Sequence, residues 1–66
     1  MKVVVNGEPT ELQSGATVEA VLASLELPDR GVAVAIDGEV VPRGRWPQTA
    51  IEDDASVEVV MAVQGG

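Results

Sequence analysis

Two kinds of hydrophobic spacing alternate along the chain, and together they predict both strands and a helix. Most apolar runs are short and rich in valine, which is typical of β-strands. The predicted strands are 1–6, 10–13, 32–37, 39–41 and 57–63. Residues 17–27 are spaced differently, because their apolar positions fall on one stripe of an amphipathic helix. The positions of this stripe are Val18, Val21, Leu22 and Leu25.

Turn and capping residues mark the borders of these elements. Asn6-Gly7 and Asp37-Gly38 predict tight two-residue turns, because both residues of each pair tolerate a positive φ. Thr17 is expected to cap the helix, and Leu27 to end it, because the residue before a proline is pushed out of the helical region. The segment 42–56 predicts a loop with room for one helical turn.

The order of elements favours an α+β roll. One helix cannot cover both faces of a sheet of four to five strands, so the sheet is expected to be mixed and folded across that one main helix. In such a roll the first and last strands can lie side by side at the centre as a parallel pair, and the crossover that contains the helix is long enough to allow this arrangement. Residues 1–63 form the domain, and 64–66 are expected to be a flexible tail.

The two faces of the last strand predict different roles. The residues expected on the core face are Val57, Val59, Met61 and Val63. Val60 and Ala62 lie on the other face, where they are too apolar for simple solvent exposure and indicate a partner-binding surface. A covering loop is the alternative.

Composition narrows the possible functions. The chain has 66 residues, 45% of them apolar, which allows one domain held by aliphatic packing without cysteine or histidine. A net charge of −7 argues against nucleic acid. The acidity is expected to serve solubility alone, with a basic partner surface as the alternative. No apolar run approaches the roughly 20 residues of a membrane span. We expect a cytoplasmic protein.

Residues for independent catalysis are missing. Without His and Cys there is no Ser–His or Cys–His pair, and the chain has no phosphate-binding glycine motif. The carboxylates of 52–54 are expected to form a solvated turn rather than a metal site. Trp46 is expected to be part of the core, with an interface anchor as the alternative. Arg43 and Arg45 are expected to be solvated, with contact to acidic groups of a partner as the alternative. We therefore expect no enzyme, no catalytic residue and no bound metal or cofactor.

The end of the chain is the remaining candidate for chemistry. Gln64-Gly65-Gly66 follows the last strand, and its glycines remove side chains that would obstruct a narrow channel. A carboxylate becomes an acyl donor only after activation, for example as an acyl-adenylate that another protein forms from ATP. The carboxylate of Gly66 is therefore the candidate acceptor of the adenylyl group, and Gly65 and Gln64 form the spacer. The alternative is a frayed terminus.

Several blocks of sequence resemble one family. They are the first strand with Asn6, GATVEAVLASL at 15–25, VAVAIDGEVVPRGRW at 32–46, and the final VQGG. In this order they resemble the ThiS family of small sulfur carrier proteins of thiamine biosynthesis, which have the ubiquitin-like β-grasp fold. The turn EDDAS at 52–56 departs from the family, which usually has a Gly-Asp pair there.

The resemblance implies a mechanism and partners. A ubiquitin-activating-type adenylyltransferase would adenylate Gly66 with ATP, and sulfur from a cysteine desulfurase persulfide would then give a thiocarboxylate. Thiazole synthase would use that sulfur to build the thiazole ring. The alternatives are the small subunit of molybdopterin synthase, a ubiquitin-like modifier conjugated to lysines, and a plain interaction domain.

Overall fold

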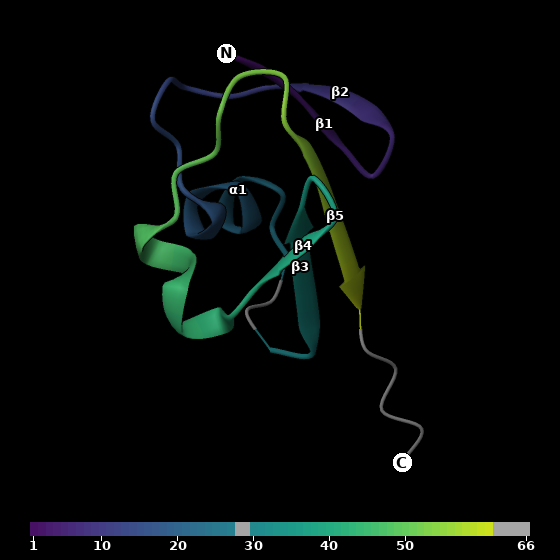
Figure 1. Ribbon diagram of the computed structural model, residues 1–66, viewed down its shortest axis with the longest axis vertical. Helices are drawn as coiled ribbons and strands as arrows, with labels where there is room; N and C mark the ends of the chain where they lie inside the picture. The colour runs from purple at the N-terminus through teal and green to yellow at the C-terminus, as the bar shows by residue number, and fades with distance from the viewer. Residues whose placement is uncertain (28–29, 62–66) are drawn as a thin grey trace.

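Five strands form one mixed sheet, and one α-helix packs on it. The computed structural model describes residues 1–27 and 30–61. The strands are β1 (Lys2–Val5), β2 (Glu8–Glu11), β3 (Val32–Ile36), β4 (Glu39–Val41) and β5 (Ser56–Met61), and the helices are α1 (Val18–Ser24) and the 3₁₀ helix η1 (Arg43–Gln48). The strand order is β2-β1-β5-β3-β4. Figure 1 shows α1 and η1 on the same side of this sheet.

The two predicted turns are confirmed. Asn6 and Gly7 have φ values of 52° and 84°, and Asp37 and Gly38 have 50° and 86°, the positive values that a tight hairpin turn requires. The predicted return strand 10–13 is displaced by two residues, because β2 begins at Glu8 directly after the turn and ends at Glu11. Pro9 lies inside β2, which is tolerated because β2 is an edge strand and needs no N–H from Pro9 on its open side.

The helix begins where it was predicted to begin and ends earlier. The Ala20 N–H donates to Oγ1 of Thr17 at 3.2 Å, which confirms the cap. The prediction that the helix runs to 27 is wrong, because α1 ends at Ser24. Glu26 takes a left-handed φ of 57°. The Leu27 N–H then reaches the Leu22 carbonyl at 3.0 Å, which closes the last turn in the manner of a Schellman motif.

The first and last strands lie side by side at the centre of the sheet, as predicted. β1 and β5 are parallel, with Val4 opposite Ser56 and Val5 opposite Val57. On its other side β5 is antiparallel to β3, from Val32 opposite Met61 to Ile36 opposite Val57. The chain therefore enters β5 between two neighbouring strands, in the most protected position of the sheet.

Aliphatic side chains between the sheet and α1 form the core. The buried residues are Val3, Val5, Val18, Val21, Leu22, Val34, Trp46, Ile51, Ala55, Val57 and Val59. The prediction that Met61 belongs to this core is wrong, because its side chain is 55% exposed. Met61 ends β5 and pairs with the first residue of β3, so it lies at the margin of the sheet. Val63, predicted for the same face, lies outside the described residues.

The loop before β5 holds the six-residue helix η1 and a buried tryptophan. Trp46 on η1 is 4% exposed, and its indole N–H donates to the Val41 carbonyl at 2.9 Å. This contact joins η1 to the end of β4. The chain then crosses the start of α1, where the Val18 N–H donates to the Thr49 carbonyl at 3.0 Å. Trp46 is thus a core residue, as predicted.

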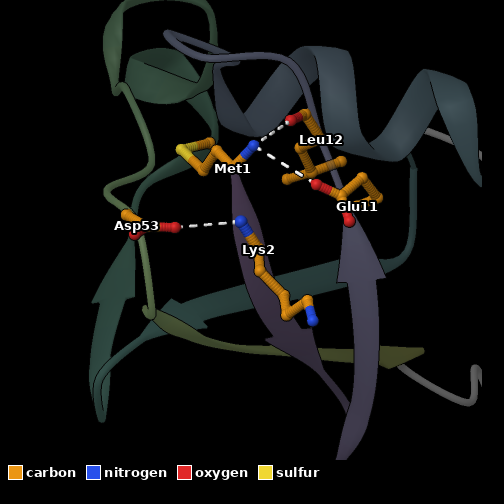
Figure 2. A network of polar contacts seen from close by, with 5 residues as sticks. All are labelled: Met1, Lys2, Glu11, Leu12 and Asp53. Atoms are coloured by element: carbon orange, nitrogen blue, oxygen red, sulfur yellow. Dashed lines mark hydrogen bonds and ion pairs between the residues drawn. The ribbon is translucent and has the colours of Figure 1, made fainter.

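Polar contacts hold the N-terminal residues against the turn that precedes β5 (Figure 2). The Met1 amino group donates to the Leu12 carbonyl at 2.9 Å. The Lys2 N–H donates to Oδ1 of Asp53 at 2.9 Å, and the Asp54 N–H donates to the Lys2 carbonyl at 2.7 Å. Asp54 has a φ of 69°, a left-handed conformation that aspartate tolerates. The acidic turn therefore fixes the start of β5.

Candidate functional site

Most of the predicted site lies outside the described residues. This applies to Ala62, Gln64, Gly65 and Gly66. Met61 is the last described residue of β5, and the segment 62–66 spans at most about 18 Å when fully extended. The described part of the site is therefore the last half of β5 and the sheet surface beside it.

Val60 lies on the sheet face opposite α1, which we call the outer face. Its side chain is 61% exposed, whereas its neighbour Val59 on the helix side is 9% exposed. Val60 pairs with Ala33, whose side chain is also exposed. The alternation along β5 therefore gives Val60 the orientation that was predicted for it.

The outer face continues from Val60 across β3 to the edge strand. Ala35 is the next residue of β3 on the same face as Ala33. It pairs with Val40 of β4, which is 69% exposed. Glu58 of β5 is exposed opposite Ala35 on the same face. The result is a small apolar surface of valine and alanine with a carboxylate beside it. Such a surface suits a partner that combines an apolar centre with a basic group.

A side chain from the first turn holds the last half of β5. The carboxamide of Asn6 accepts a hydrogen bond from the Val59 N–H at 2.8 Å. Its Nδ2 donates to the Val59 carbonyl at 3.2 Å. Sequence reasoning identified Asn6 as a turn residue but missed this contact. The pair is 53 residues apart in the chain, and only the strand order shows that they meet.

Arg43, Arg45 and Trp46 do not converge with Val60. All three belong to η1, on the helix side of the sheet (Figure 1). Arg45 lines a groove of about 510 Å³ beside β4, together with carboxylates that include Glu39 and Glu52. The described residues therefore place η1, which carries both arginines, on the side of the sheet opposite Val60, and Arg45 near the edge strand β4.

The described part of the chain offers no metal centre. No group of three or more Asp, Glu, His or Cys side chains in it is arranged to hold an ion. The acidic turn at 52–54 instead receives backbone hydrogen bonds, such as the one from Lys2 to Asp53. No helix in the described ranges has the length and apolar character needed to cross a membrane.

Comparison with known proteins decides the family. The sequence profile of the ThiS family matches residues 3–66. The chain belongs to the ThiS family. The sulfur carrier protein ThiS of Escherichia coli is 29% identical over 66 residues, and the match covers both chains completely. The predicted family of sulfur carriers of thiamine biosynthesis is confirmed.

Solved structures and longer relatives agree with this ThiS-family assignment. The crystal structure of the thiamine biosynthesis protein ThiS from Geobacter metallireducens superposes with a TM-score of 0.86 at 29% identity, and covers both chains fully. The predicted β-grasp fold is therefore confirmed. Two proteins named thiazole synthase, from Paramagnetospirillum magneticum and Magnetococcus marinus, are 39% and 36% identical to the chain. The chain spans 20% of the length of each of these two proteins.

Proposed function

We propose that this ThiS-family chain is a sulfur carrier for thiamine biosynthesis, loaded at the carboxyl group of Gly66. The family match over residues 3–66 carries the proposal, because it includes the final Gly65-Gly66 pair. The chain serves as a protein co-substrate: its partners supply the catalysis, and one of them consumes ATP. A cytoplasmic location stays a prediction from the sequence.

The loading reaction has two stages. A carboxylate oxygen of Gly66 attacks the α-phosphorus of ATP, pyrophosphate leaves, and an acyl-adenylate forms. The terminal sulfur of a persulfide then attacks the acyl carbon, and AMP leaves with the bonding electron pair. A thiol cleaves the resulting S–S bond, which leaves a thiocarboxylate on Gly66 and a disulfide on the donor. Gly65 and Gln64 act as the spacer that carries the carboxyl group into the partner.

The proposed partners follow from the family and from the longer relatives. They are an adenylyltransferase of the ubiquitin-activating type, a cysteine desulfurase or other persulfide donor, and thiazole synthase. The two relatives named thiazole synthase support the last of these, because a region similar to this chain is part of each. Covalent linkage raises the effective concentration of a carrier near the enzyme that uses it.

The test is intact-protein mass spectrometry. We expect the 66-residue chain, incubated with the activating enzyme, ATP and a persulfide donor, to gain the mass difference of one oxygen exchanged for one sulfur. Omitting ATP should prevent the gain, because no acyl-adenylate forms. The chain alone should not convert any thiamine precursor. An unchanged mass in the complete mixture would contradict the proposal.

We propose that the adenylyltransferase docks on the outer face at Val60 and Ala62. Exposure of Val60 and Val40 supports this surface, as does its continuity along β5 with the segment that leads to Gly66. Val60→Asp should raise the KM of the chain as a substrate for adenylation about tenfold, because a carboxylate would lose water on docking. Adenylation kinetics measured as pyrophosphate release provide the test.

Ala20→Asp is the matched control for this variant. Ala20 is an exposed residue of α1, on the other side of the sheet, and the change adds the same charge. Both variants should keep the far-UV circular dichroism spectrum of the native chain, because exposed substitutions usually change stability by less than about 0.5 kcal/mol. An equal KM for the two variants would place the docking surface elsewhere.

A further inference from the structure

Main-chain hydrogen bonds join β1 to one side of β5, and they stop where β1 turns into β2. Val4 and Asn6 donate their N–H groups to the carbonyls of Ala55 and Val57, at 2.9 and 2.8 Å. The next β5 residue whose main chain faces this side is Val59, two positions further along. β1 has already turned away at that point, because Asn6 and Gly7 take positive φ values.

The carboxamide of Asn6 takes the place of one more residue of β1. It accepts from the Val59 N–H at 2.8 Å and donates to the Val59 carbonyl at 3.2 Å. An amide side chain offers a carbonyl oxygen that accepts and an NH2 group that donates, as a strand residue does with its main-chain carbonyl and N–H. Both polar groups of Val59 are thereby paired on the side of β5 that faces away from β3, where β1 no longer runs alongside.

We infer that Asn6 is a positioning residue for sulfur loading, because its carboxamide keeps the end of β5 in place. The inference rests on the proposed function. Val59 immediately precedes Val60 of the outer face, and only seven positions separate it from Gly66. Fixing the Val59 main chain therefore fixes both the docking residue and the point from which the terminal segment starts. The partner then does not have to order these residues on binding, which lowers the cost of association.

The second turn provides a matched comparison. Asp37 also has a positive φ and also binds β5 through its side chain, because the Ser56 N–H donates to Oδ1 of Asp37 at 3.0 Å. This contact lies at the start of β5, three residues before Val59. Removing the Asp37 side chain therefore affects β5 as well, but it leaves the contact between Asn6 and Val59 in place.

The variants are therefore Asn6→Gly and Asp37→Gly. Glycine accepts a positive φ, so each change removes the side-chain contact without straining the turn. Asn6→Gly should raise the KM of the chain in adenylation about tenfold, the factor expected for the loss of two hydrogen bonds, with kcat within about twofold. Asp37→Gly should leave KM unchanged within about twofold. Asn6→Asp, which keeps the acceptor for the Val59 N–H, should raise KM by a smaller factor than Asn6→Gly.

Amide hydrogen exchange gives a readout that does not depend on the enzyme. The Val59 amide should exchange at least about tenfold faster in Asn6→Gly than in the unmodified chain, while the Val3 amide in β1 keeps its rate. Because the chain is the substrate, a general loss of stability would lower the concentration of folded substrate and raise the apparent KM at an unchanged kcat. The folded fraction of each glycine variant, measured by far-UV circular dichroism, therefore corrects the substrate concentration before the KM values are compared.

The outcomes separate this inference from the proposed function. If the unmodified chain is loaded and Asn6→Gly and Asp37→Gly have the same KM, the positioning role is wrong and the carrier function stands. If Val59 exchange is unchanged in Asn6→Gly, the carboxamide does not hold β5 and the inference also fails. If the unmodified chain gains no sulfur, the proposed function fails and the inference fails with it.

Discussion

Deleting Gly66 is expected to abolish sulfur loading while leaving the fold unchanged. The buried residues of the described chain all lie between Val3 and Val59, so removal of the last residue takes nothing from this core. The deletion withdraws the carboxyl group by about 3.5 Å. A displacement of about 1 Å at a reacting atom can cost about 100-fold in rate. Intact-protein mass spectrometry should therefore detect no exchange of oxygen for sulfur.

Two further variants distinguish the position of the carboxyl group from the bulk of the spacer as the cause of failed loading. Gly65→Val keeps the length of the chain and adds a branched side chain to the spacer, and it should also fail to load. A chain with one alanine added after Gly66 moves the carboxyl group outward by about 3.5 Å and should fail for the opposite reason. Native circular dichroism spectra are the control for folding. Sulfur gain by the truncated chain equal to that of the unmodified chain would show that Gly66 is not the acceptor.

The sequence predicted those parts of the fold that depend on interactions between residues close together in the chain. Asn6-Gly7 and Asp37-Gly38 predict the turn type directly, because few other residue pairs accept two positive φ values. The stripe on residues 17–27 identified a helix whose buried residues are Val18, Val21 and Leu22. The parallel pairing of β1 and β5 was indicated as an arrangement that the length of the helix-containing crossover allows.

The parts that could not be predicted depend on contacts between distant residues. The helix ends at Ser24, and Glu26 then takes a left-handed conformation, although glycine is the residue usually found at that position. Pro9 is accepted inside β2 only because the strand order leaves that strand at an edge. The contact of Asn6 with Val59 likewise depends on β1 ending beside the middle of β5. At the candidate site, sequence predicted the orientation of Val60, while the docking role stays a prediction.

Trp46→Ala is expected to have the largest effect on stability. Trp46 is the only aromatic residue of the chain and is 4% exposed in a core otherwise made of aliphatic side chains. Truncation of a buried tryptophan typically costs about 3–5 kcal/mol. A domain of this length has about 3–10 kcal/mol of unfolding free energy in total. The variant should therefore be largely or wholly unfolded at 25 °C, as urea titration followed by far-UV circular dichroism would show.

Trp46→Phe tests two things. It shows how much of the stabilisation comes from packing and how much from the indole hydrogen bond, and it shows whether Trp46 takes part in docking. Phenylalanine keeps much of the apolar volume but cannot donate to the Val41 carbonyl, so it should cost about 1–3 kcal/mol and leave the chain folded. Because η1 lies on the helix side of the sheet, the folded variant should have an unchanged KM for adenylation. A raised KM with native circular dichroism would instead make Trp46 part of the partner surface. An unfolding free energy of Trp46→Ala within about 0.5 kcal/mol of the unmodified chain would contradict the core assignment, because burial of this side chain would then contribute nothing to the fold.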